Sequence, residues 1–186
     1  MSTQRLFLAI ALPEPVRATL VALMEPLPGV NWTRPEQLHV TLRFLGDVQN
    51  EKIDALIEHL SGVRVEPFLL PIEGVGAFPP HPPPRVVWVG VGTGHPRLHQ
   101  LRQRADDALL AAGLAELDVR MFHPHVTLAR CTKPAAAAIG HWLHTRREFA
   151  APPFRVGAFD LCASELQPTG AVHTLVQRFP LASGKN

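Results

Sequence analysis

The sequence has few of the features that mark secreted, disordered or nucleic-acid-coating proteins. Its 186 residues include only two cysteines, Cys131 and Cys162, which form no CxxC pattern, so no disulfide framework is predicted and a reducing, cytoplasmic setting is expected. The 46% hydrophobic and 18% charged residues are typical of a globular protein and exclude a disordered chain. A formal net charge of +2 does not resemble that of a protein that coats long nucleic acid, but it suits an anionic ligand touched at a few points.

Long apolar runs are also missing. The apolar run 6–12 follows a single basic residue, Arg5, and precedes Pro13-Glu14-Pro15 rather than a small-residue cleavage site. It is far too short to span a membrane. We therefore predict a buried first strand, no membrane association and, for a chain of this length, a real hydrophobic core.

What the sequence does have is one tetrapeptide in two copies. His39-Val40-Thr41-Leu42 recurs 86 positions later as His125-Val126-Thr127-Leu128. Both copies lie in apolar, β-branched runs, which predict strands. Side chains alternate along a strand, so each His shares a face with the Thr two residues on, and the aliphatic side chains point to the other face. The apolar face is the predicted core, and the polar face needs another explanation.

A second tetrapeptide supports an internal duplication. Val75-Gly76-Ala77-Phe78 recurs as Val156-Gly157-Ala158-Phe159, at an offset of 81, and both copies are predicted on the strand after the second helix of their half. Hydrophobic periodicity and turn residues predict strands near 5–12, 38–45, 68–78, 85–91, 118–130, 154–161 and 171–179, and helices near 15–27, 50–60, 98–112 and 134–145. Asn50 is the expected cap of the second of these helices.

The predicted architecture is a single two-lobed α+β domain over residues 1–186. Each lobe is a β-α-β-α-β unit, the two lobes are related by pseudo-twofold symmetry, and their largely antiparallel sheets face a central cleft. Five prolines in the segment 79–84 predict an extended connection, because proline cannot continue a helix or a central strand. The expected lobes are residues 1–80 and 85–181, and the central strand of each carries one motif toward the cleft.

Two imidazoles that face one cleft can act as a general acid and a general base. Histidine titrates near neutral pH, so one ring can accept a proton while the other donates one. The hydroxyls of Thr41 and Thr127 can hydrogen-bond a phosphoryl group between them. In-line displacement at phosphorus needs these parts: a base behind the nucleophile, an acid on the leaving oxygen and donors to the other oxygens. The residues alone leave open which of His39 and His125 is the acid.

A metal site is the rival use of clustered histidines. Zinc sites usually take three or four ligands from His, Cys, Asp or Glu, and neither motif has a carboxylate or Cys at ligand spacing on its polar face. No metal ligands are therefore predicted. A further alternative is a non-catalytic binding module. A binding module would not need a paired acid and base.

The paired motifs resemble those of the two-histidine phosphoesterases, and their flanks resemble the bacterial and archaeal RNA 2′,3′-cyclic phosphodiesterases, also called 2′-5′ RNA ligases. The matching segments span nearly the whole chain: 5–7, 32–36, 39–46, 76–79, 123–130, 168–171 and 179–181. The resemblance implies hydrolysis of an RNA-terminal 2′,3′-cyclic phosphate to a 2′-phosphate, with His39 as proton donor, His125 as proton acceptor and no metal or nucleotide cofactor. It also implies the reverse reaction, which joins RNA ends through a 2′-5′ linkage. Beside this function, two alternatives remain: an enzyme that acts on small cyclic nucleotides, and a non-catalytic module that binds RNA ends. One departure is His173, where the family suggests an aromatic residue such as tyrosine.

The expected partners are RNAs with a cyclic phosphate end, among them tRNA fragments, and we expect a cytoplasmic monomer. Three residues are candidate substrate contacts. Arg43 shares strand parity with His39, so alternation places it toward the cleft, with a solvated edge position as the alternative. Arg130 has the opposite parity from His125, so it reaches the cleft only if the strand bends or ends, and its selection depends mainly on the family motif. His123 shares parity with His125 and is expected at the cleft edge.

Overall fold

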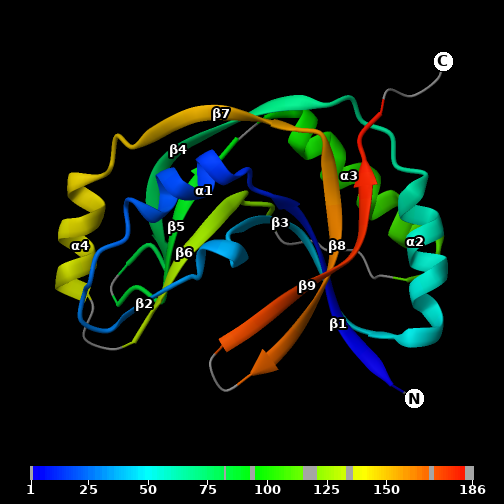
Figure 1. Ribbon diagram of the computed structural model, residues 1–186, viewed down its shortest axis with the longest axis horizontal. Coiled ribbons are helices and arrows are strands. Elements are labelled where there is room, and N and C mark those ends of the chain that lie inside the picture. Colours follow the sequence, from blue (N-terminus) through cyan, green and yellow to red (C-terminus); the bar gives the residue numbers. More distant parts are fainter. Residues whose placement is uncertain are drawn as a thin grey trace.

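One curled antiparallel sheet forms the frame of the protein, and helices pack against it (Figure 1). The structure is a computed structural model and describes residues 2–81, 83–92, 95–114, 121–132, 136–167 and 170–182. The strands are β1 (Thr3–Ala11), β2 (Val30–Trp32), β3 (His39–Gln49), β4 (Phe68–Phe78), β5 (Val86–Val91), β6 (His125–Cys131), β7 (Ala150–Val156), β8 (Ala158–Gln167) and β9 (Gly170–Pro180). The α-helices are α1 (Glu14–Val21), α2 (Ile53–Ser61), α3 (Pro96–Ala111) and α4 (Ala136–Thr145), with short 3-10 helices η1 (Pro35–Gln37) and η2 (Asn50–Lys52).

The predicted α+β class with antiparallel strands is confirmed. Hydrogen-bonded neighbours follow the order β7-β4-β5-β6-β3-β1-β8-β9, and β2 pairs with β6. Figure 1 shows α4 at one end of this sheet and α2 with α3 at the other. The first part of the predicted strand 118–130 and of the predicted helix 134–145 lies outside the described residues, as do residues 168 and 169 of the closing family segment.

Alternation along the two motif strands produces the core as the sequence predicts. The aliphatic residues of both motifs are at most 1% exposed: Val40, Leu42, Val126 and Leu128. Helix α3 covers this layer with one fully buried face, made of Leu98, Leu101, Ala105 and Leu109. Full burial of one such leucine contributes about 1.5–3 kcal/mol, so the motif strands are fixed from their apolar side.

Two helix boundaries differ from the prediction. Helix α1 ends at Val21 rather than near 27, because Pro26 disfavours a helical conformation at Glu25 before it. Asn50 does not cap α2. It lies in η2, and its Nδ2 donates to Oγ of Ser2, 2.9 Å away, which ties the end of β3 to the start of β1.

The two halves of the chain exchange strands. β4, from the first half, lies between β5 and β7 of the second half, whereas β8, with β9 beside it, pairs with β1. The segment 79–84, of which residue 82 is not described, therefore joins two neighbouring strands, since Phe78 pairs with Val86 across it. The division into two lobes, with this segment as their connection, stays a prediction.

The second repeat also differs between the halves. Val75–Phe78 lies within β4, but the matching residues 156–159 span the end of β7, Gly157 and the start of β8. The strand predicted over 154–161 is thus divided at Gly157. The reason lies in the partners, because β7 pairs with β4 while β8 pairs with β1 and β9.

Candidate active site

The two motif strands are neighbours in the sheet. β3 and β6 pair antiparallel at the second residue of each motif. His39, Thr41 and Thr127 line one cavity of about 670 Å³. His125 is not part of that wall, although its charge reaches His39 and lowers the pKa of that ring. The arrangement brings both imidazoles and both hydroxyls to one side of the sheet.

The two histidines are held by the same hydrogen bond. Nδ1 of His39 donates to the carbonyl of Gln37, and Nδ1 of His125 donates to the carbonyl of His123, each over 2.7 Å. Because a carbonyl oxygen only accepts, Nδ1 of each ring carries a proton and Nε2 is left for chemistry. Nε2 of His39 lies 3.1 Å from Oγ1 of Thr41, whose hydroxyl donates to the neutral ring. The repeated sequence thus orients two imidazoles in the same way.

Burial keeps both imidazoles neutral. The pKa of His39 is lowered to about 4, mainly by desolvation; the hydrogen bond to Gln37 opposes this shift, and repulsion from His173 and His125 adds to it. Desolvation also lowers the pKa of His125, whose bond to the His123 carbonyl raises it while the His123 ring lowers it. At neutral pH each Nε2 can therefore accept a proton, and a ring that acts as an acid must first take one up.

Each motif strand contains a bulge directly after its threonine. In β3 the pairing with β1 skips Leu42, and in β6 the pairing with β5 skips Leu128, the corresponding residue of the second motif. An extra residue in a strand turns the side chains that follow it to the opposite face. Parity counted from the histidine therefore fails beyond the threonine in both motifs.

The bulge turns Arg43 away from the cavity, and its predicted cleft position is wrong. Its side chain is almost fully buried, and its Nε lies 3.6 Å from Oδ1 of Asp106 on α3. Arg102 donates to the same carboxylate and to the carbonyl of Leu42, so α3 holds the bulge from behind. Phe44 takes the place expected for the arginine, because it lines the cavity.

The corresponding bulge in β6 turns Arg130 toward the cavity, a position that alternation alone did not predict. Arg130 lines the wall together with Arg5 and Arg34. Among the described residues of this wall there is no Asp or Glu, so its charged side chains are all cationic. The exposed side chains of Phe44 and Leu166 add apolar surface to it. The site therefore suits an anion that carries an apolar group.

His123 is placed beside the second motif rather than in the cavity wall. Its ring centroid lies 5.9 Å from that of His125, and it packs edge-on against Trp88 and Phe78 at 4.8 and 5.3 Å. The side chain is exposed, and its backbone carbonyl orients His125. His123 thus contacts a predicted catalytic residue, and a contact with substrate stays a prediction.

His173, on β9, is a residue of the site that the sequence did not place. It lines the cavity, with its ring 5.1 Å from His39 and 4.8 Å from Phe7. No motif surrounds it, and the sequence shows only that it replaces an expected aromatic residue. Its location follows from the pairing of β9 with β8, which places it opposite Ser164.

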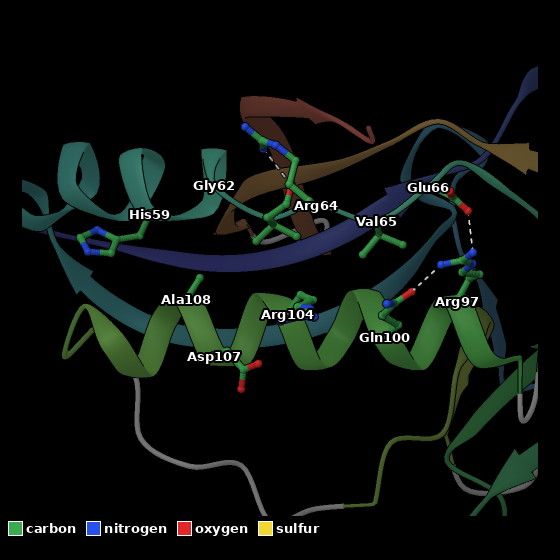
Figure 2. A pocket seen from close by; sticks show the side chains of 11 residues that line it. His59, Gly62, Arg64, Val65, Glu66, Arg97, Gln100, Arg104, Asp107 and Ala108 are labelled. Carbon is green, nitrogen blue, oxygen red and sulfur yellow. Dashed lines mark hydrogen bonds and ion pairs between the residues drawn. The ribbon is translucent and has the colours of Figure 1, made fainter. Parts of the chain in front are cut away.

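A second cavity, of about 660 Å³, lies between α2 and α3 and contains no motif residue (Figure 2). Arg97 there is paired with Glu66 and Gln100, and Arg64 bonds backbone carbonyls at the end of α2. Among the described residues, no group of three or more His, Cys, Asp or Glu could hold a metal ion. None of the helices in the described part of the chain has the length and apolar character to cross a membrane.

Two imidazoles and two hydroxyls beside a cationic cavity on a curled antiparallel sheet are the parts of a phosphoesterase. Comparison with known proteins identifies the family: the model of the LigT like phosphoesterases matches residues 10–88 and again 89–173. The chain belongs to the LigT-like phosphoesterase family. The two successive matches agree with the duplicated motif.

Individual relatives point the same way. An RNA 2′,3′-cyclic phosphodiesterase of Thermus thermophilus is 33% identical over 95% of this chain and 90% of its own length. One of Aeropyrum pernix is 43% identical, but the alignment spans 51% of this chain and only about half, 53%, of that protein. The crystal structure of TT0787 of Thermus thermophilus superposes with a TM-score of 0.81 and 30% identity, over 97% of this chain and all of that one.

Proposed function

We propose that this protein hydrolyses a 2′,3′-cyclic phosphate at the end of an RNA to a 2′-phosphate, with His39 as acid and His125 as base. One observation carries the proposal. Both histidines have Nδ1 tied to the backbone carbonyl two residues earlier, so that two equivalent Nε2 atoms remain for proton transfer beside a cationic cavity. A binding module has no need for two imidazoles held in this way.

The proposed reaction has one displacement at phosphorus. Nε2 of His125 takes a proton from water as the water oxygen bonds to phosphorus. The bond from phosphorus to the 3′ oxygen breaks, and Nε2 of His39 gives its proton to that oxygen. Hydroxyls of Thr41 and Thr127 donate to the non-bridging oxygens, and the guanidinium of Arg130 offsets their charge. Ligation uses the same groups in the same roles: a 5′-hydroxyl takes the place of water, the bond from phosphorus to the 3′ oxygen breaks, and the product is a 2′-5′ linkage with a free 3′-hydroxyl.

The acid must be charged before it can act. With a pKa near 4, His39 is neutral in the free protein at pH 7. An anion bound beside His39 favours the imidazolium form. Substrate binding therefore raises the pKa of His39, and the ring takes up from solvent the proton that the reaction needs. The order of events is then binding, proton uptake and bond breaking.

Two features favour a nucleotide end over a bare phosphate. The cavity of about 670 Å³ is within the range of small-molecule sites. Phe44 can stack on an unpaired base, the usual way in which proteins hold single-stranded RNA. Arg5 and Arg34 can contact further phosphates of the chain. The names of the relatives, RNA 2′,3′-cyclic phosphodiesterases, support RNA as the substrate, with tRNA fragments as one source of such ends.

The test is incubation with a short RNA that ends in a 2′,3′-cyclic phosphate, in the presence of a chelator, with the position of the product's phosphate identified. We expect a 2′-phosphate. The same RNA with a 3′-phosphate is the control, and 2′,3′-cyclic AMP tests for a small-nucleotide enzyme. Tight RNA binding without any turnover would reject the proposal in favour of a binding module. Turnover of cyclic AMP alone would limit the substrate to small nucleotides.

A further inference from the structure

The cavity wall carries a second imidazole beside His39, that of His173. The two ring centroids are 5.1 Å apart at an interplanar angle of 78°, and both rings pack against Phe7. Nδ1 of His173 is buried and finds no hydrogen-bond partner within the described residues. Packing rather than a hydrogen bond therefore holds this ring against His39, at some cost in free energy.

All the charged side chains that line the cavity around His173 are cationic. The charged or titratable residues that line the same cavity are His39 from β3, Arg130 from β6, Arg5 from β1 and Arg34 from the segment before η1. From β8 the residue opposite His173 is Ser164, which does not titrate. In the described wall no carboxylate offsets these charges. A proton on either imidazole thus disfavours a proton on the other.

The direction in which each pKa is shifted follows from this geometry. Burial and the charge of Arg130 lower the pKa of His173, and His173 is in turn one cause of the lowered pKa of His39. The charge on one ring therefore affects the protonation of the other.

We propose that His39 and His173 form a pair that holds at most one proton, and that His173 is a positioning residue that adds to burial in opposing protonation of His39 until an anion enters the cavity. The proposal rests on the proposed function, in which His39 is the acid. An anion supplies the negative charge that the wall lacks, and His39 then takes a proton from solvent. Before the anion binds, His39 carries no proton on Nε2, so only the occupied site can protonate the leaving oxygen.

The experiment follows the His39 ring by NMR while pH is varied, in the full chain without substrate. His173→Gln removes the second charge, and His173→Tyr does so while keeping a ring against Phe7. His173→Lys makes the charge permanent. We expect the pKa of His39 to rise in the first two variants and to fall in the third. His144→Gln, at an exposed position of α4, is the matched control and should change nothing.

Adding inorganic phosphate to the wild-type protein should raise the pKa of His39. Identical titration of His39 in all three His173 variants, or no response to phosphate, would overturn the pairing. Turnover of cyclic-phosphate RNA at pH 7 should fall in His173→Lys by about tenfold for each unit by which the pKa of His39 falls. Because the NMR titration needs no RNA, an absence of hydrolysis by the wild type would reject the proposed function and leave the result on the pair intact.

Discussion

Phe44 and Arg130 occupy the same position relative to the two motifs, two residues beyond the leucine that each bulge skips, and both line the cavity. One is an aromatic ring that is 58% exposed and the other is a cation. The two motif strands are thus alike in backbone, but the side chains that they contribute to the cavity differ. A nucleotide, which has an apolar base at one end and an anionic phosphate at the other, fits such a wall in one orientation. That orientation distinguishes the otherwise equivalent histidines.

Replacing either histidine should remove most turnover. We expect His39→Ala and His125→Ala each to lower it by about 10²-fold or more, because each ring has its own proton to move. The wild-type pH profile should be a bell, and each variant should lose one limb of it where chemistry limits the rate. The double variant should cost much less than the product of the single effects, since the pair acts as a unit. A single variant with near wild-type turnover would reject the two-histidine mechanism.

The threonines should behave differently. Thr127→Val removes a hydroxyl donor to a phosphate oxygen, and we expect turnover to fall by about 10²-fold or less with the shape of the pH profile unchanged. Thr41→Val also removes the partner of His39 Nε2, so its profile should shift as well as fall. Profiles of equal shape in both variants would show that the bond between Thr41 and His39 has no part in setting the acid.

Replacing Arg130 should affect activity, as expected of a substrate contact, whereas replacing Arg43 should affect stability, as expected of a structural residue. Arg130→Gln should weaken turnover of cyclic-phosphate RNA with little change in melting temperature, because the side chain is exposed at the cavity. Arg43→Gln leaves Asp106 with one cation fewer beneath the bulge, and we expect a loss of about 1–3 kcal/mol in the free energy of unfolding. Denaturant unfolding and steady-state kinetics on both variants check this. The reverse pattern would mean that the bulge does not turn these side chains as described.

Stability should fall as the solution becomes acidic. Folding lowers the pKa of His39 from its ordinary value of 6.5 to about 4, so between these values the unfolded chain binds more protons than the native protein. Stability is then fully present above about pH 6.5 and is lost as pH falls toward 4. Melting temperatures from pH 7 to 4 measure this loss, and His39→Gln should make it shallower. An equal slope in that variant would assign the loss to other groups.

Strand periodicity was enough to predict where the site lies but not all of its members. His39, Thr41 and Thr127 line one cavity, on the face that alternation predicts for them, whereas His125 lies outside its wall. Alternation gave the wrong side of the strand for Arg43, because a bulge depends on the partner strand and no residue of the motif predicts it. His173 could not be placed either, because its nearness to His39 arises from the pairing of β8 with β1 and β9.

The order of the strands in the sheet could not be predicted from local sequence patterns either. Two β-α-β-α-β halves with a proline-rich segment between them predicted two lobes in sequence. The structure instead places β4 beside β5 and β8 beside β1. Hydrophobic patterns specify that a strand is buried, but they do not specify which neighbour buries it.

The exchange of strands has a consequence for the origin of the chain. β4, the last strand of the first half, pairs with β5, the first strand of the second half. In the same way β8, from the second half, pairs with β1, the first strand of the first half. A half-length ancestor would find that partner only in another copy of itself. A twofold dimer that swaps its terminal strands, later fused into one polypeptide, would build the same sheet, with one histidine from each subunit on either side of the axis.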